Sequence, residues 1–306
     1  MVKAVGYIDG AISGLADTRI PVADRGFLYG DSVYEVFRTY SGIPFLFDEH
    51  YQRLLNSARL IEMNINQSKQ EIIDAVKRTV RASLPAAGED VYTRYQITRG
   101  EGPIDLNPEL SLQTRLVIIV KAAPQWNREF YDNGVTLAVP KLRRNSVNSL
   151  DPNIKGGNYL NNIIALGEAK KRGADDCLML DANGLVTECS NSNVWFVVDG
   201  KLVTPAGGNL DGLTRRSLIS LFADANIEVV QRPIHSKELA DATECFVTSA
   251  TREVMPVRAL YSVGGSKIEF PSGGGQQTRQ AMTIYKRMLE DFVKENKEHA
   301  WFDFFH

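Results

Sequence analysis

The chain has 306 residues, 43% of them hydrophobic and 24% charged, with a net charge of −2 at pH 7; this balance is typical of a globular protein and excludes collagen-like and disordered chains. The charge gives no sign of a nucleic-acid partner, and no apolar run approaches the roughly 18 residues that a membrane span needs. Cys177, Cys189 and Cys245 are too few and too scattered for a disulfide framework, so we expect a cytoplasmic protein.

The first part of the chain predicts strands with two helices grouped between them. We expect strands at 2–9, 32–40, 43–47, 91–98 and 116–121, from their β-branched and aromatic residues and the turns beside them. Asp24-Arg25-Gly26 is expected to be a loop. One helix should be capped by Asp48, and the next should open at Ser68, which has the spacing of a capping box with Glu71.

The second part alternates more often between strands and helices. Its first helix should be capped by Asn158 and closed by Gly173. Further strands are expected at 135–140, 177–180, 185–188, 193–198, 201–204, 228–233 and 244–248, and further helices at 214–225 and 278–297. Short turns separate the four strands between 177 and 204, which predicts a meander. The aromatic tail, 300–306, should dock on the protein or on a partner subunit.

These elements predict a two-domain α+β or α/β protein. A small domain should occupy residues 1–122, and a large domain should occupy residues 135–306. Residues 123–134 are the predicted linker, because they contain Pro124 and end beside Gly134.

Lys155 is the first candidate for covalent chemistry. It lies in a loop that enters a helix, and Gly156 and Gly157 follow it at once, which lets a bulky group approach the backbone. Lysine is the one side chain that forms a Schiff base with an aldehyde. A lysine taken alone is far more often a solvated surface residue, so the interpretation depends on its companions.

Two further charged residues are candidates for the same site. Glu188 ends a predicted strand beside a polar loop, where a carboxylate can pair with a protonated ring nitrogen. Arg53 lies at the margin of the apolar stripe of its helix, where it could bind an anion or pair with an acidic residue.

Backbone anion sites are predicted at a helix start, Gly212-Leu213-Thr214, and in a turn, Ser249-Ala250-Thr251. Such N–H groups bind anions, although the same residues also serve as simple caps. Tyr92 and Arg94 share a face of one strand and could hold a carboxylate together. A lysine, a carboxylate, an arginine and two anion sites are the set that a phosphorylated aldehyde with a pyridine ring requires.

The sequence contains no motif typical of a metal site or a nucleotide site. The four histidines are far apart, and none has a metal-ligand spacing such as H-E-x-x-H, so no metal is expected. No G-x-G-x-x-G motif follows a strand, and there is no P-loop motif, which argues against a nucleotide site.

Six motifs occur along the chain in a specific order. They are residues 24–31 (DRGFLYGD), 50–54 (HYQRL), 155–159 (KGGNY), 188–193 (ECSNSN), 212–215 (GLTR) and 248–257 (TSATREVMPV). In this order they resemble the fold-type IV pyridoxal-phosphate enzymes, the class IV aminotransferases, from about Tyr7 to about Arg258. The resemblance implies a cofactor, pyridoxal 5'-phosphate, in the cleft between two domains. It also implies an amino acid or amine and a 2-oxo acid as substrates, and a homodimer or higher homo-oligomer.

The resemblance also implies a role for each candidate residue. Lys155 is similar to the family's Schiff-base lysine and proton shuttle, and Glu188 to the partner of the pyridine nitrogen. Tyr159 would contact the ring hydroxyl. The phosphate would be bound by Arg53, Leu213, Thr214, Ala250 and Thr251, and Ser249 would also bind the cofactor. The substrate would contact Tyr29, Tyr34, Arg38, Tyr92 and Arg94, with the loop around Tyr29 helping to close the pocket of the neighbouring subunit.

The resemblance to the family does not decide which substrate the protein uses. Tyr92-x-Arg94 resembles branched-chain amino-acid aminotransferases, so we expect a branched-chain L-amino acid and a 2-oxo acid such as 2-oxoglutarate, in a ping-pong reaction. Gln96–Gly100 and Asp24-Arg25-Gly26 are instead similar to D-amino-acid aminotransferases and aminodeoxychorismate lyases. An R-selective amine transaminase is a further alternative. The alternative of another class is a non-catalytic protein that binds a phosphate ligand, although plain binding needs neither Lys155 nor Glu188.

Overall fold

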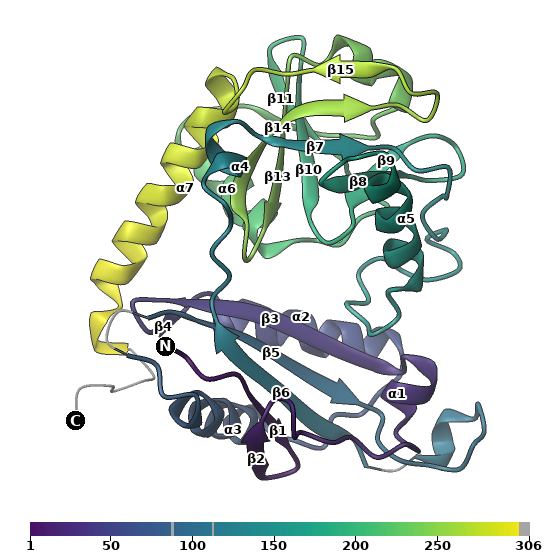
Figure 1. Ribbon diagram of the computed structural model, residues 1–306, viewed down its shortest axis with the longest axis vertical. Helices are drawn as coiled ribbons and strands as arrows, with labels where there is room; N and C mark the ends of the chain where they lie inside the picture. Colours follow the sequence, from purple (N-terminus) through teal and green to yellow (C-terminus); the bar gives the residue numbers. More distant parts are fainter. Residues whose placement is uncertain (87–88, 112, 300–306) are drawn as a thin grey trace. The chain divides into compact units, whose positions relative to one another are not determined.

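The computed structural model describes residues 1–86, 89–111 and 113–299, and the chain divides into two compact units (Figure 1). The first unit contains Met1–Pro124, Ile154–Asn158 and Leu289–His306. The second contains Gln125–Asn153 and Tyr159–Met288. Residues 154–158, which include Lys155, belong to the first unit. The residues directly before and after this segment belong to the second unit.

In the part of the chain that is described, the first unit contains a six-stranded antiparallel sheet in the order β2-β1-β6-β5-β3-β4. Its strands are β1 (Val5–Ile8), β2 (Ala11–Gly14), β3 (Ser32–Tyr40), β4 (Ile43–Pro44), β5 (Val91–Thr98) and β6 (Arg115–Ala122). Its helices are α1 (Arg25–Tyr29), α2 (Phe47–Leu60) and α3 (Lys69–Ala82), and a short 3-10 helix, η1, covers Pro108–Leu110.

The two faces of this sheet differ in polarity. On one face, apolar residues of β3 and β5 such as Phe37 and Tyr95 are fully buried with residues of α2 and α3, including Leu54 and Ile72. Side chains alternate across a strand, so the residues between them lie on the other face. That face carries a polar set in register, with Tyr34 opposite Gln96, Val36 opposite Arg94 and Arg38 opposite Tyr92.

The second unit is built on a nine-stranded sheet within the described residues, in the order β12-β11-β10-β13-β14-β7-β8-β9, with β15 paired to β14. Its strands are β7 (Val135–Ala138), β8 (Asp176–Leu180), β9 (Val186–Cys189), β10 (Asn193–Val198), β11 (Lys201–Thr204), β12 (Val229–Gln231), β13 (Glu244–Ser249), β14 (Glu253–Tyr261) and β15 (Lys267–Glu269). The remaining elements are α4 (Glu129–Asp132), α5 (Leu160–Lys171), α6 (Leu213–Asp224), α7 (Gln276–Glu295), η2 (Ser236–Asp241) and η3 (Lys297–His299).

The central strands of this sheet are buried on both sides. Every residue of β8, β9 and β10 is buried, which is the pattern of strands covered on both faces. Helix α5 packs on β8 through small residues such as Ala165 and Ala169, and α6 packs on β12 and β13. The predicted site residues of this unit lie near the ends of its strands and at the starts of its helices.

Several elements of the sequence-based prediction are confirmed. The grouping of α2 and α3 between strands, strand 91–98 and the Ser68–Glu71 capping box are all present. At the capping box, Ser68 Oγ accepts from the N–H of Glu71 at 3.2 Å, and the Glu71 carboxylate accepts from the N–H of Ser68 at 2.7 Å.

Three predicted local features are wrong. The N-cap of α2 is Leu46 in a left-handed conformation, and Asp48 lies in the first turn, where it pairs with Lys69. The N-cap of α5 is Tyr159 rather than Asn158. Asp24 caps a short helix, α1, where a loop was expected.

The predicted meander is only partly correct, and three strands were not predicted. β8 pairs with β9, and β10 pairs with β11, but these hairpins are separated in the sheet by β13, β14 and β7. Local turn residues define a hairpin and not its place in a sheet, because that place depends on pairing between distant segments. The strands β2, β14 and β15 were missed, and the predicted docking of tail 300–306 lies outside the described residues.

Candidate active site

The backbone around Lys155 lies beside β3 in the first unit. Its N–H donates to Ser57 Oγ at 3.1 Å, and its carbonyl accepts from the N–H of Tyr34 at 2.9 Å. A Cβ on Gly157 would lie 2.3 Å from Ser32 Oγ, so this glycine permits the close approach of the segment to β3. These contacts fix the backbone of Lys155 against the strand that carries Tyr34.

The amine of Lys155 belongs to a cluster of cations around the ring of Tyr34. Lys155 Nζ lies 3.5 Å from the Tyr34 hydroxyl and 4.5 Å from the centre of its ring. The guanidinium carbon of Arg94 lies 3.5 Å from the same ring centre. Such contacts between cations and aromatic faces are attractive and orient the charged groups.

The guanidinium of Arg94 is aligned by a polar chain along the sheet. Its Nε and Nη2 donate to Gln96 Oε1 at 3.2 and 2.8 Å, and Gln96 Nε2 donates to Ser32 Oγ at 2.8 Å. Burial raises the pKa of Tyr92, so its phenol stays protonated at neutral pH and can donate. The structure thus confirms that Tyr92 and Arg94 share one face, and it adds Gln96 to that face.

Arg53 is paired with Glu35, a residue that the sequence analysis did not select. Arg53 Nε lies 2.7 Å from Glu35 Oε1, and Nη2 lies 2.8 Å from Oε2. His50 Nδ1 lies 2.6 Å from the same Oε2. Glu35 is fully buried, and although burial opposes its ionisation, Arg53 and His50 hold its pKa well below the usual range. The signal was a carboxylate on the apolar face of an alternating strand.

Tyr29 and Arg38 lie elsewhere in the first unit. Tyr29 ends α1, and the guanidinium carbon of Arg25 is 5.1 Å from its ring centre. Arg38 lies on the same face as Tyr92, with its guanidinium carbon 4.5 Å from the ring centre of Tyr40 and its Nη2 3.9 Å from Asp90 Oδ2. Their predicted contacts with substrate stay predictions.

Glu188 is the residue before the last of β9 in the second unit and is 6% exposed, so it is not a surface carboxylate. Its Oε1 accepts from Arg144 Nε at 3.1 Å and pairs with Nη2 at 3.0 Å. Its Oε2 accepts from the N–H of Leu210 at 3.1 Å. These contacts fix the orientation of the carboxylate. Nothing in the sequence pattern singled out Arg144.

The two predicted anion sites of this unit are a helix start and a tight turn. Gly212 is the N-cap of α6 and, within the described residues, no side chain caps the N–H groups that begin with Leu213 and Thr214. A Cβ on Gly212 would lie 1.9 Å from Asn193 Oδ1, which explains the glycine. Ser249, Ala250 and Thr251 join β13 to β14, and Tyr159 is the N-cap of α5.

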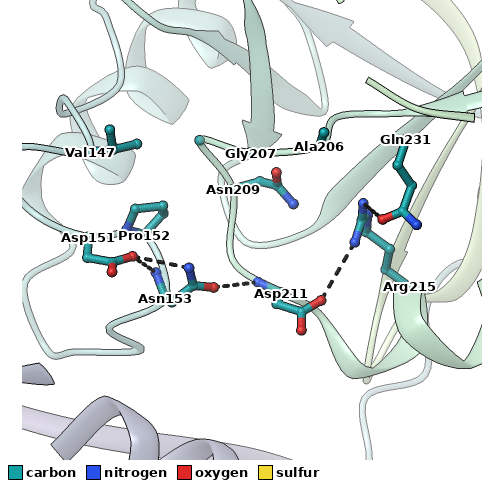
Figure 2. Close-up of a pocket in the computed structure, with 11 residues that line it drawn as sticks. Val147, Asp151, Pro152, Asn153, Ala206, Gly207, Asn209, Asp211, Arg215 and Gln231 are labelled. Carbon is teal, nitrogen blue, oxygen red and sulfur yellow. Dashed lines mark hydrogen bonds and ion pairs between the residues drawn. The ribbon is translucent and has the colours of Figure 1, made fainter. Parts of the chain in front are cut away.

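A polar pocket lies in the second unit beside the loop that supports Glu188 (Figure 2). It has a volume of about 360 Å³. Figure 2 shows hydrogen bonds and ion pairs running along its wall through Asp151, Asn153, Asp211, Arg215 and Gln231. The pocket contains none of the predicted site residues, so it is distinct from the set that carries the predicted chemistry.

Comparison with known proteins identifies the family. The family model described as "Amino-transferase class IV" matches residues 32–260. This chain belongs to the class IV aminotransferases. It is therefore a pyridoxal-phosphate-dependent transaminase with the fold-type IV architecture, which acts on amino and 2-oxo compounds.

Among class IV aminotransferases, the chain resembles proteins with more than one described substrate. It is 33% identical over 288 residues to a protein of Methanocaldococcus jannaschii described as a putative branched-chain-amino-acid aminotransferase, covering 94% of each chain. It is also 33% identical over 252 residues to a D-alanine aminotransferase of Listeria monocytogenes, covering 81% of this chain and 84% of that protein.

A solved structure also supports membership in the class IV aminotransferases. The branched-chain amino acid aminotransferase of Escherichia coli has a TM-score of 0.82 and 28% identity to this chain. The match covers 92% of each of the two chains.

The residues of this aminotransferase chain fit pyridoxal 5'-phosphate by the chemistry of their donors. Lys155 offers an amine, Glu188 offers a buried carboxylate paired with Arg144, and α6 offers N–H groups that no side chain caps among the residues the structure describes. When bound, the cofactor supplies an aldehyde carbon that reacts with amines and a ring that accepts electrons. Within residues 1–86, 89–111 and 113–299, no cluster of His, Cys, Asp and Glu could hold a metal ion. Of the helices described, none combines the length and apolar character needed to cross a membrane.

Proposed function

We propose that this transaminase moves the amino group of a branched-chain L-amino acid to a 2-oxo acid such as 2-oxoglutarate. The observation that carries the proposal is the cluster of Lys155 and Arg94 around Tyr34, which offers an amine for proton transfer beside a guanidinium for a carboxylate. The similarity to the M. jannaschii protein described as a putative branched-chain enzyme supports the choice of substrate.

In this proposal, the cofactor is held by its phosphate and by its ring. Arg53 binds its phosphate from the first unit, and Glu35 sets the direction of the guanidinium. The N–H groups at the start of α6 and in the 249–251 turn bind the same phosphate. The proposed phosphate ligands are Arg53, Leu213, Thr214, Ser249, Ala250 and Thr251. Tyr159 contacts the ring hydroxyl.

Lys155 and Glu188 perform the proposed proton chemistry. The Lys155 amine would act as the base that takes the α-proton from the substrate and, once protonated, as the acid that gives the proton back, while the bound cofactor would supply the ring that accepts electrons. The Glu188 carboxylate holds a proton on the ring nitrogen by a charge-assisted hydrogen bond. Arg144 and the N–H of Leu210 keep that carboxylate in place.

The substrate carboxylate is proposed to bind to Arg94 and Tyr92. Arg94 offers a planar fork of donors, and Tyr92 offers a protonated phenol on the same face. Tyr34, Arg38 and Tyr29 are proposed to surround the rest of the substrate, with Tyr29 serving the neighbouring subunit in a homodimer. The two substrates would share one site in turn, which is a ping-pong reaction.

A D-amino-acid aminotransferase is the second candidate. Its support is the 33% identity to the Listeria D-alanine aminotransferase and the Gln96–Gly100 segment. Turnover should be measured with L-leucine, D-alanine, R-phenylethylamine and aminodeoxychorismate as alternative substrates. The proposal requires L-leucine to be preferred, and preference for D-alanine, the amine or the lyase substrate would each assign one of the alternatives.

The chemistry itself is tested at Lys155. The purified protein should show a visible absorption band, and borohydride should attach the cofactor covalently to Lys155, located by mass spectrometry. Lys155→Ala should abolish transamination. Binding of the cofactor without turnover in the unaltered protein would support the non-catalytic alternative.

A further inference from the structure

Asp176 is a buried carboxylate in the second unit that the proposed chemistry does not use. It begins β8 and is 1% exposed. Its Oδ1 accepts from the N–H of Cys177 at 2.8 Å and from the N–H of Ser190 at 3.3 Å. Its Oδ2 accepts from Arg252 Nη1 at 2.6 Å. Asp176 thus contacts Ser190, which lies two positions after Glu188, and Arg252, which directly follows Thr251.

Arg252 secures the turn that precedes it. Its N–H donates to Ser249 Oγ at 3.2 Å, which closes the 249–251 turn. Its guanidinium carbon lies 5.0 Å from the ring centre of Trp126, and Trp126 Nε1 donates to the carbonyl of Thr251 at 2.9 Å. The turn is therefore held by its own hydroxyl, by an indole and by the ion pair with Asp176.

Asp176 connects Arg252 with a second segment, the loop that follows β9. Besides its bond to Asp176, Ser190 accepts at its carbonyl from Asn162 Nδ2 at 2.9 Å. Arg252 Nη1 also lies 3.4 Å from Ser192 Oγ in the same loop. Glu188 lies in β9, two residues before Ser190, so displacement of Ser190 would change the direction of its carboxylate.

The burial of this ion pair makes it unlike a surface salt bridge. Arg252 is 9% exposed, so loss of either partner leaves a charge in a poorly solvated place. Such a pair fixes the geometry of the segments that it joins, because any movement separates the charges. The ion pair connects the 249–251 turn, which we propose binds the phosphate, with the loop after Glu188, which we propose contacts the ring nitrogen. Its rigidity would therefore fix these two parts of the proposed site.

We infer that Asp176 and Arg252 are positioning residues that keep the 249–251 turn in register with Glu188 and so set the affinity for the phosphate end of the cofactor. The inference rests on the proposed function, because it takes the turn and Glu188 as cofactor ligands. Neither residue contacts substrate in this account. Both act through the groups that they hold.

The test is a double-mutant cycle on cofactor affinity. The variants Asp176→Asn, Arg252→Gln and the double variant should be titrated with pyridoxal 5'-phosphate and, separately, with pyridoxal, after removal of the bound cofactor. We expect each single variant to weaken binding of the phosphorylated form at least tenfold, which is about 1.4 kcal/mol, with a much smaller effect on pyridoxal. The double variant should be no weaker than the worse single variant, because the two residues act as one unit.

Two further variants separate positioning from a general loss of stability. Glu244→Gln removes a buried carboxylate at the other end of β13, where it accepts from the N–H and Oγ of Thr278 at 2.8 and 2.7 Å. It should lower the thermal midpoint without changing the ratio of affinities for the two ligands. Arg252→Lys keeps the charge beside Asp176 and should restore part of the affinity lost in Arg252→Gln.

Two results would overturn the inference. One is an affinity for pyridoxal 5'-phosphate within twofold of that of the unaltered protein in both single variants, whatever their thermal midpoints. The other is equal weakening towards both ligands, which would mean a structural role alone. Failure of the proposed function would look different, since the unaltered protein would then not carry the cofactor on Lys155 after borohydride treatment.

Discussion

Arg53 and Glu35 meet as a two-point ion pair, with Nε 2.7 Å from Oε1 and Nη2 2.8 Å from Oε2. The carboxylate is fully buried on β3, and the arginine side chain on α2 is 10% exposed. His50 contacts the same carboxylate and, because burial lowers its pKa more than Glu35 raises it, is neutral at pH 7. The pair therefore fixes the direction of the guanidinium, which we propose binds the phosphate.

Glu35→Gln should weaken both the fold and the cofactor site. The substitution places amide hydrogens against a guanidinium that remains charged and buried, and breaking such pairs costs about 3 kcal/mol or more. We expect the free energy of unfolding to fall by about that amount and cofactor affinity to fall at least tenfold. Denaturant titration and cofactor titration measure the two effects. Glu101→Gln is the control, because it removes a half-exposed partner of Arg115 and should cost less than about 1 kcal/mol.

His50 should make stability depend on pH in the acidic range. Its pKa in the folded protein lies below its ordinary value of 6.5, so the unfolded chain binds a proton first as the pH falls. Stability should therefore decrease below about pH 6.5, at no more than about 1.4 kcal/mol per pH unit from this one group. His50→Gln should flatten the curve between pH 7 and pH 5. An unchanged slope in that variant would contradict the assignment.

The residues that we propose for the chemistry could be selected from the sequence, whereas Arg144, which orients one of them, could not. Lys155, Glu188 and Arg94 stand in local motifs, and the structure places each beside polar partners. Arg144, which pairs with Glu188, and Asp176, which pairs with Arg252, come from other segments, and nothing in their own neighbourhood distinguishes them from ordinary charged residues. A distant contact leaves no periodic signal in one sequence.

The same distinction explains which parts of the fold were predicted. The capping box at Ser68 and the alternation in β5 are local, and both are confirmed. The separation of the β8–β9 hairpin from the β10–β11 hairpin depends on strands that arrive from residues 135–138 and 244–261. Turn residues near 183 and 199 specify hairpins only, because sheet order is decided by long-range pairing.

The two helix starts in the first unit give a matched stability prediction. Ser68→Ala removes a side-chain cap and should lower the free energy of unfolding by about 1 kcal/mol. Asp48→Ala removes only an exposed ion pair with Lys69 and should cost less than about 0.5 kcal/mol. Urea unfolding of both variants measures the difference. Equal costs would mean that the cap bond at Ser68 contributes nothing measurable.

Arg94→Lys should affect substrate binding more than turnover. Lysine keeps the charge but loses the fork that contacts Gln96 and, in our proposal, the substrate carboxylate. We expect KM for the amino acid to rise at least tenfold, with kcat changed less. Arg78→Lys is the matched control, because Arg78 also lies over an aromatic ring, that of Tyr7, away from the predicted site residues. An unchanged KM in Arg94→Lys would remove Arg94 from substrate binding.

Glu188→Gln should reduce turnover by about a hundredfold or more, because a neutral amide cannot keep a proton on the ring nitrogen as a carboxylate does. The change falls mainly on kcat, since the substrate carboxylate is held by other residues in our proposal. Arg144→Gln should give a smaller loss, because Glu188 would still accept from the N–H of Leu210 at 3.1 Å. Steady-state kinetics over a pH series measures both variants. If Glu188→Gln retained full kcat while Arg144→Gln lost it, Arg144 rather than Glu188 would carry the electrostatic role.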